Sequence, residues 1–129
     1  MNILNLSHPL TPKQLEQIQA RVGGSIDAVI NPHVHFDVNQ DFVPQVISLL
    51  DDLKITPERW QGEVWLVLLP SLNHITAILL AEMHGRTGKF PTMLRLRPVS
   101  TEFATEYELA EIINLQRVRE EARTRRGGV

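Results

Sequence analysis

The chain contains no cysteine, and this absence excludes several kinds of chemistry. Without a thiol there can be no disulfide, thiolate metal site, iron–sulfur cluster or cysteine nucleophile. The chain also lacks an apolar run close to the roughly 20 residues that a membrane-spanning helix needs. No basic flank precedes an apolar stretch at the N-terminus, so we expect no secretion signal. A cytoplasmic protein without a membrane segment is therefore the expected class.

The motifs of common nucleotide-binding and hydrolytic enzymes are missing as well. The chain has neither the Gly-x-Gly-x-x-Gly pattern of dinucleotide-binding domains nor the Gly-x-x-x-x-Gly-Lys-Ser/Thr pattern of P-loop proteins. It also lacks the nucleophile elbow that would support a Ser-His-Asp triad. No pair of carboxylates is placed as hydrolysis would need, and Asp51-Asp52 reads as a charged helix face.

What is present describes one ordinary globular domain over residues 1–129, with a tail at 123–129 that we expect to be frayed. The net charge of −2 hides an asymmetry, because residues 1–85 carry −5 and residues 86–129 carry +3. The local excess of positive charge in residues 86–129 suits a small anionic ligand better than duplex DNA, because proteins that bind duplex DNA usually carry a broader basic surface. The alternative explanation is that these positive charges only keep the protein soluble.

Strand-like and helix-like segments alternate along the chain. Alternating or continuous apolar runs predict strands over residues 2–6, 25–30, 63–69, 92–97 and 107–113. Helical spacing of apolar residues predicts helices over 13–22, 42–53 and 72–84, a turn or one-turn helix near 57–62, and a terminal helix from 115. This order predicts an α/β fold: a single Rossmann-like domain, with a mainly parallel sheet and helices on both faces.

Helix and strand ends follow from the residues that flank these segments. Thr11, Asp41 and Ser71 are the expected N-caps. Gly23-Gly24 should end the first helix, and Gly85 with Gly88 should break the helix over 72–84. The apolar residues of that helix cover most of its circumference, so it should lie deep in the domain or meet another subunit.

Ligands of open α/β sheets bind outside the carboxyl ends of the strands. That rule selects the stretches that follow the predicted strands: Ser7-His8-Pro9, Asn31-Pro32-His33, Pro70-Ser71-Leu72-Asn73 and Arg97-Pro98. If residues 107–113 form a strand, Asn114 and Gln116 stand at the same rim. Ser71, Leu72 and Asn73 open a helix whose free amides attract anions. The alternative is that Ser71 only caps the helix.

Histidines and arginines are the remaining candidates for chemistry. His8 at a strand end can serve in acid–base chemistry or be an ordinary loop histidine. The spacing of His33, His35 and Asp37 permits a metal site, although alternation alone also puts them on one face. His74 and His84 lie too far apart on one helix to share an ion.

Arg86, Arg95 and Arg97 are the candidate cations. Arg95 and Arg97 share one face of the predicted strand over 92–97, and they must pair with carboxylates or meet phosphates because unpaired burial of two guanidinium groups is costly. Arg97 lies nearer the carboxyl end of its strand and is the favoured ligand residue, whereas a surface salt bridge is as plausible for Arg95.

Five motifs, taken together and in their order along the chain, resemble those of small CRISPR-associated proteins of type III systems, in the CARF-like ring-nuclease group. They are Asn5-Leu6-Ser7-His8-Pro9-Leu10-Thr11, Pro70-Ser71-Leu72-Asn73, His84-Gly85-Arg86-x-Gly88-x-Phe90-Pro91, Leu94-Arg95-Leu96-Arg97-Pro98 and Glu111-Ile112-Ile113-Asn114-Leu115. The similarity covers nearly the whole chain, from about residue 3 to residue 125.

The resemblance implies binding of a cyclic oligoadenylate, above all cyclic tetra-adenylate, by a homodimer without metal or cofactor. It implies that Ser7 and His8 flank a phosphate or ribose and that Ser71, Leu72 and Asn73 hold a phosphate. Arg86 and Arg97 would be supporting cations. A cyclic tetramer contains a two-fold axis, so an isologous dimer can offer it two identical half-sites.

Two mechanisms suit such a pocket. The protein would either sequester the ring or align the ribose 2′-hydroxyl for attack on the neighbouring phosphate, with His8 assisting proton transfer. Because the chain has no strong catalytic pair, sequestration with slow cleavage ranks above efficient cleavage. The alternatives from other classes are a dimeric scaffold that binds a partner protein, and a metal-dependent hydrolase that uses His33, His35 and Asp37.

Overall fold

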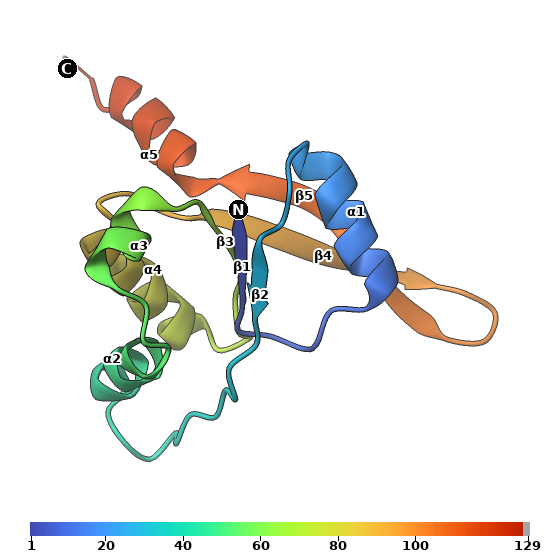
Figure 1. The fold of residues 1–129 in the computed structure, drawn as a ribbon, viewed down its shortest axis with the longest axis horizontal. Coiled ribbons are helices and arrows are strands. Elements are labelled where there is room, and N and C mark those ends of the chain that lie inside the picture. The colour runs from blue at the N-terminus through green and yellow to red at the C-terminus, as the bar shows by residue number, and fades with distance from the viewer. Residues whose placement is uncertain (128–129) are drawn as a thin grey trace.

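The computed structural model describes residues 1–127, which form one five-stranded sheet with helices on both faces (Figure 1). The strands are β1 (Asn2–Asn5), β2 (Ala28–Ile30), β3 (Trp65–Leu68), β4 (Thr92–Ser100) and β5 (Thr105–Asn114). The helices are α1 (Pro12–Val22), α2 (Phe42–Asp52), α3 (Pro57–Gly62), α4 (Asn73–Thr87) and α5 (Leu115–Thr124).

The spatial order of the strands is β2-β1-β3-β4-β5. The first four strands run parallel, and β5 returns antiparallel to β4. The chain moves from β1 to one side for β2 and then crosses to the other side for β3, so the strand order reverses between β1 and β3. The α/β fold with a mainly parallel sheet is confirmed, and this reversal is where such folds form a ligand crevice.

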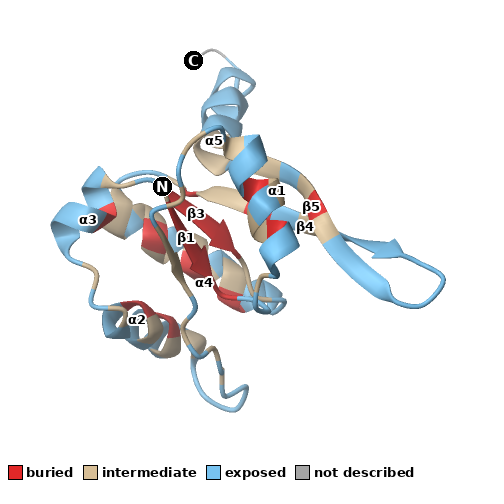
Figure 2. Ribbon diagram, turned by 45° about the vertical axis from the view of Figure 1, so that its right-hand side comes forward, coloured by how far each residue is buried: buried red, intermediate tan, exposed pale blue. Residues whose placement is uncertain are grey.

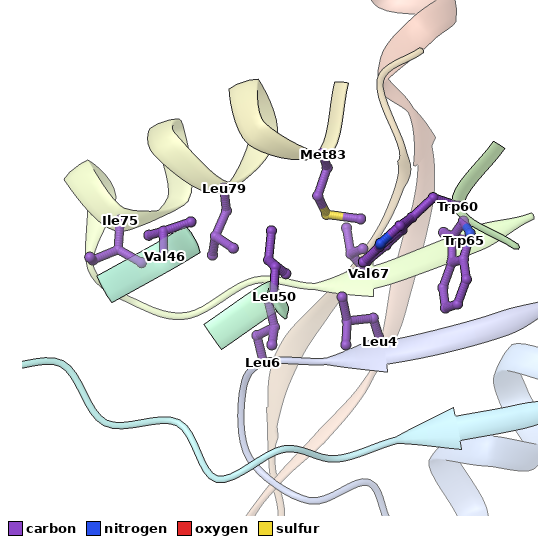
Figure 3. Packing of buried hydrophobic residues seen from close by; sticks show 10 residues of the cluster. All are labelled: Leu4, Leu6, Val46, Leu50, Trp60, Trp65, Val67, Ile75, Leu79 and Met83. Carbon is purple, nitrogen blue, oxygen red and sulfur yellow. The ribbon is translucent and has the colours of Figure 1, made fainter. Parts of the chain in front are cut away.

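Two apolar cores lie on opposite faces of the sheet. On one face, α1 packs Ile18 against Ile3 and Leu66, with Leu94 and Leu109 in the same cluster. On the other face, α2, α3 and α4 cover the sheet, and their buried residues meet those of β1 and β3 (Figure 3). All four residues of β3 are buried, as its apolar run predicts for a central strand (Figure 2).

The first helix forms as its sequence predicts. The Thr11 hydroxyl accepts a hydrogen bond from the Gln14 amide, and the Gln14 side chain accepts one from the Thr11 amide, which completes a capping box. Pro12 occupies the first turn, where its missing N–H costs nothing. Gly23 ends the helix in the left-handed conformation at φ 67°.

The predicted ends of α2 and α4 need correction. Asp41 stands at the N-cap of α2, yet its side chain forms no capping hydrogen bond. The prediction that Ser71 caps α4 is wrong, because Leu72 is the N-cap and no side-chain capping bond forms there. Gly85 does not break α4 either, since the helix continues through it and ends at Gly88, at φ 85°.

The strand over residues 92–97 also runs further than predicted, because Pro98 does not close it. Pro98 pairs with Tyr107, and β4 continues to Ser100 as one arm of a long hairpin with β5. The Tyr107 carbonyl accepts a hydrogen bond from α1, so it faces away from β4. In such a pair the backbone of Pro98 faces the opposite, free edge, where a missing N–H breaks no bond of the ladder.

The terminal helix α5 follows β5 and stands apart from the main layers (Figure 1). Asn114 caps it by accepting the Arg117 amide at 3.0 Å. The helix continues through Thr124, the second residue of the tail that we expect to be frayed, and residues 128–129 of that tail lie outside the described residues. Within residues 1–127, no helix is both long and apolar enough to cross a membrane.

Candidate functional site

A pocket of about 540 Å³ opens at the carboxyl ends of β1 and β3, next to the point where the strand order reverses. This volume lies within the range of about 300–1,000 Å³ that is usual for small-molecule sites. Ser7 and His8 contribute polar groups from the loop after β1. Pro9 comes from the same loop, and the remaining lining residues come from the end of β3, from α1, from β4 and from β5: Gln14, Leu68, Leu69, Met93, Leu94, Arg95, Leu96 and Tyr107.

The pocket forms where β3 and β4 stop pairing and diverge. Their pairing stops at Val67 with Met93, whereas β4 continues to Ser100. Beyond that point the edge of β4 that faces β3 has no strand partner among residues 1–127. The two strands therefore form the sides of a wedge at the carboxyl end of β3, and the Ser7-His8 loop borders it.

Backbone groups also face this wedge. The Leu109 amide donates to Gln17 and thus points away from β4. Leu109 pairs with Leu96, so the N–H and C=O of Leu96 point to the other edge of β4, on the side of the wedge. A free donor and acceptor on one residue can hydrogen-bond a planar polar edge such as that of a nucleobase.

Asn5 holds the loop that carries Ser7 and His8. Asn5 is 2% exposed, and its side chain makes three hydrogen bonds. The Asn5 amide donates to the His8 carbonyl at 2.9 Å and to Asn31 Oδ1 at 3.0 Å, and its oxygen accepts the Ser7 amide at 3.0 Å. The loop after β1 is thereby tied to the residue that follows β2.

The predicted anion cradle at Ser71, Leu72 and Asn73 lies at the same edge of the sheet but does not line the pocket. Asn73 Oδ1 accepts the His74 amide at 2.9 Å, so one of the first amides of α4 is occupied by a neighbouring side chain. Ser7 and His8 share the pocket with Leu68 and Leu69, which directly precede the cradle in sequence. The structure thus brings the two predicted regions to one rim without joining them in one cavity.

All three candidate arginines pair with carboxylates. Arg86, with a side chain 20% exposed, bonds to Glu82 and to Asp51 and so ties α4 to α2. On β4, Arg95 pairs with Glu111 at 2.7 Å and Arg97 with Glu108 at 2.8 Å. Of the three, only Arg95 lines the pocket.

The two pairs on β4 are half-exposed, and such ion pairs contribute only about 0–1 kcal/mol. Exchange of Glu111 for a ligand anion would therefore cost Arg95 little. Arg86 is different, because its two partners hold it between helices on the far face of the sheet.

The histidines of the predicted metal site do not form one. His33 and His35 are exposed and border a separate open pocket over α2, beside Gln45 and Asp52. Asp37 is engaged by Gln45, which accepts its amide and donates to its carbonyl. Within residues 1–127, no three His, Cys, Asp or Glu side chains are grouped so that they could hold a metal ion.

Apart from Ser7 and His8, sequence reasoning assigned none of the lining residues to the ligand, and it also missed Asn5, which holds the bordering loop. Asn5 lies in the motif over residues 5–11 but was predicted to be an ordinary polar residue of the strand over 2–6, and only the structure shows that it is buried at the last residue of β1. Tyr107 comes from the antiparallel strand, whose direction no local pattern reveals. Arg95 was placed behind Arg97 because the carboxyl end of the strand was expected at residue 97 rather than at residue 100.

Chemically, the pocket lining combines apolar side chains with Ser7, His8 and Arg95, which carry a hydroxyl, an imidazole and a guanidinium. Its lining contains no pair of carboxylates, and His8 is its one imidazole. This composition suits recognition of a ligand that has both a flat apolar part and an anionic part. Comparisons with protein-family models, with curated proteins and with solved structures found no match to this chain.

Proposed function

We propose that this chain binds a cyclic oligoadenylate, above all cyclic tetra-adenylate, and lowers its free level by sequestration, slow cleavage or both. The observation that carries the proposal is the pocket at the β1–β3 crossing, with Ser7 and His8 at its border. Open α/β sheets bind nucleotides at this position. The ring itself is named from the resemblance of the sequence motifs.

The chemistry of the lining supports a nucleotide ligand. Leu68, Leu94 and Leu96 offer an apolar wall for an adenine base, and Tyr107 offers a ring for stacking. Ser7 and His8 can donate to a phosphate or ribose, and Arg95 adds charge once it leaves Glu111. One pocket would take part of the ring, and a two-fold pair of subunits would take two equivalent parts.

Sequestration is favoured over rapid cleavage. Attack by a ribose 2′-hydroxyl needs a base, an acid for the leaving oxygen and donors for the phosphoryl oxygens. His8 can fill one of these roles, but no second acid–base side chain is paired with it in the pocket lining. A binder of this kind releases intact ring on denaturation or converts it slowly.

A titration of the purified chain with cyclic tetra-adenylate, followed by calorimetry, tests the proposal. We expect saturable binding near one ring per two chains, and weaker binding of adenosine monophosphate. Recovery of intact ring after denaturation identifies sequestration, and more than one ring converted per site identifies an enzyme. Absence of binding at micromolar ring would contradict both forms of the proposal.

Arg95 and Arg97 supply a matched pair of variants. Both lie on β4 and both form a half-exposed ion pair, yet only Arg95 lines the pocket. Arg95→Gln should weaken binding about tenfold, as loss of one charged hydrogen bond does. Arg97→Gln should leave binding within about twofold. Equal effects would mean that general charge, rather than the pocket, attracts the ring.

A dimeric scaffold that binds a partner protein is the second candidate. The observation that favours it is that Arg86, Arg95 and Arg97 are each already paired with a carboxylate. Under this alternative no nucleotide binds, and both glutamine variants on β4 change only the stability of the chain.

A further inference from the structure

Two asparagines that do not line the pocket fix the conformation of the loop that borders it. Asn5 does not line the pocket, and neither does Asn31. Nevertheless Asn5 bonds to the backbone on both sides of the Ser7-His8 link: its oxygen accepts the Ser7 amide, and its nitrogen donates to the His8 carbonyl. The second hydrogen of that nitrogen reaches Asn31 Oδ1.

We infer that Asn5 is a positioning residue for the binding pocket and that Asn31 orients it from the loop after β2. The inference rests on the proposed function for its consequence in binding, but the geometry stands independently. Asn5 is buried at the last residue of β1. From there its side chain bonds to the Ser7 amide and the His8 carbonyl of one loop and to the Asn31 side chain of the other. Ser7 and His8 thus meet a ligand in a conformation set before the ligand arrives.

The two asparagines have different chemical requirements. Asn5 must supply both N–H groups of its amide and an acceptor, so an aspartate cannot replace it: two donors would be lost, and a carboxylate would face two oxygens. Asn31 supplies only an acceptor to this contact. An aspartate can therefore replace Asn31, whereas an alanine cannot.

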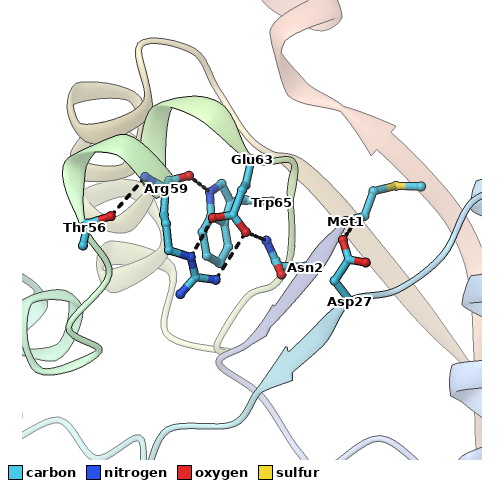
Figure 4. A network of polar contacts seen from close by, with 7 residues as sticks. All are labelled: Met1, Asn2, Asp27, Thr56, Arg59, Glu63 and Trp65. Carbon is cyan, nitrogen blue, oxygen red and sulfur yellow. Dashed lines mark hydrogen bonds and ion pairs between the residues drawn. The ribbon is translucent and has the colours of Figure 1, made fainter.

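Asn2 provides a matched control on the same strand. It is 1% exposed, close to the 2% of Asn5, and lies at the amino end of β1. Its side-chain amide donates to Glu63 at 2.9 Å (Figure 4). This contact lies at the amino ends of the parallel strands, whereas the pocket lies at their carboxyl ends. Loss of Asn2 should lower stability without disturbing Ser7 or His8.

The experiment measures hydrogen exchange of the Ser7 amide in the ligand-free chain and the Kd for cyclic tetra-adenylate. Binding is measured at about 1 M salt, where the Debye length is about 3 Å, so that the charge added by an aspartate is screened. We expect Asn5→Ala, Asn5→Asp and Asn31→Ala to raise the exchange rate of Ser7 about tenfold and to raise the Kd about tenfold. Asn31→Asp and Asn2→Ala should leave both within about twofold of the wild type.

Several outcomes overturn the inference. One is that Asn5→Ala leaves the exchange of Ser7 and the Kd no more altered than Asn2→Ala does, which would mean a general role in stability. Another is that Asn31→Asp behaves as Asn31→Ala, which would deny that an acceptor is what Asn31 supplies. Should Asn5→Ala fail to fold, the two Asn31 variants decide the question.

The failure of the proposed function is recognised separately. A wild-type chain that does not bind the ring contradicts the proposed function. The exchange rate of Ser7 in the same set of variants still decides whether Asn5 and Asn31 hold the loop.

Discussion

The side-chain amide of Gln14 donates a hydrogen bond of 2.9 Å to the main-chain carbonyl of Tyr107, and so joins the first turn of α1 to the edge strand β5. One turn further along, Gln17 accepts the Leu109 amide at 3.0 Å. Two outward-facing backbone groups of an edge strand are thus satisfied by glutamines, which protects that edge from pairing with another chain. The same contacts hold α1 beside the pocket, where Gln14 and Tyr107 form part of the wall.

Gln14→Ala should lower the free energy of unfolding by about 1–2 kcal/mol, because it removes one half of a capping box and leaves the Tyr107 carbonyl without its partner. Urea unfolding followed by circular dichroism measures the change. Gln17→Ala is the control, since Gln17 is not part of the cap and its loss should cost about 1 kcal/mol or less. A Gln14 variant as stable as the wild type would show that the contact contributes nothing.

Two glycines of α4 should respond to alanine in opposite directions. Gly85 lies inside the helix, and a Cβ there meets no atom within 4 Å, so Gly85→Ala should stabilise the chain by about 0.5–1 kcal/mol. Gly88 ends the helix at φ 85°, so Gly88→Ala should destabilise it by about 1 kcal/mol or more. Thermal unfolding of both variants checks the signs. Stabilisation by both would contradict the left-handed end at Gly88.

Stability should fall in acid through Glu63. The pKa of Glu63 is lowered from its ordinary value of 4.5, first by the hydrogen bond from Arg59 and then by the bond from Asn2 (Figure 4). A carboxyl with a lowered pKa in the folded state stabilises the fold above pH 4.5, and this contribution is lost as the pH falls through the lowered value. Urea unfolding across this range should show a steeper loss for the wild type than for Glu63→Gln. Parallel curves for the two proteins would remove Glu63 from the acid response.

The core on the α4 face should carry much of the stability. Leu79 is fully buried between α4 and the sheet, so Leu79→Ala should cost about 2–5 kcal/mol through lost burial and the cavity left behind (Figure 3). Leu72, 39% exposed just before the same helix, is the control, and its replacement by alanine should cost less than about 1 kcal/mol. Similar costs at both positions would contradict this placement of α4.

His8 should matter for the ring and Ser71 should not. His8→Ala should abolish any cleavage and weaken binding several-fold, because His8 borders the pocket and is its one imidazole. Ser71 caps no helix and does not line the pocket, so Ser71→Ala should bind normally. Labelled ring, separated after incubation, measures both activities. A Ser71 variant that loses binding would restore the predicted phosphate cradle.

Much of the secondary structure follows from local sequence. Thr11, Pro12 and Gly23 mark the ends of α1 because capping and left-handed geometry depend on neighbouring residues only. The apolar run of β3 reports burial on both faces in the same direct way. Local signals failed where side-chain contacts overrode them: α4 runs through Gly85, and Arg86 just beyond it is held by Glu82 of the same helix and by Asp51 of α2.

The position of the candidate site could be predicted from the sequence, but most of its lining residues could not. The rule that ligands bind at the carboxyl ends of strands selected the edge that bears the pocket, and Ser7 and His8 line that pocket, while their binding of a ligand stays a prediction. It could not distinguish Arg95 from Arg97, because that choice depends on where β3 stops pairing with β4. The rule also could not show that Ser71 lies outside the pocket. Leu69 lines the pocket and Ser71 follows it by two residues, but closeness in sequence does not reveal which of these side chains reach the cavity.

The amino-acid sequence by itself determined the alternation of strands and helices, the two-sided burial of the central strand and the absence of thiol chemistry, because these depend on residue type and on spacing within a few positions. Only the tertiary structure decided the strand order, the antiparallel return of β5 and the wedge between β3 and β4. It also decided the contacts of Asn5 with Asn31 and of Gln14 with Tyr107. These contacts join residues 26 and 93 positions apart, so they exist only once the whole sheet has assembled.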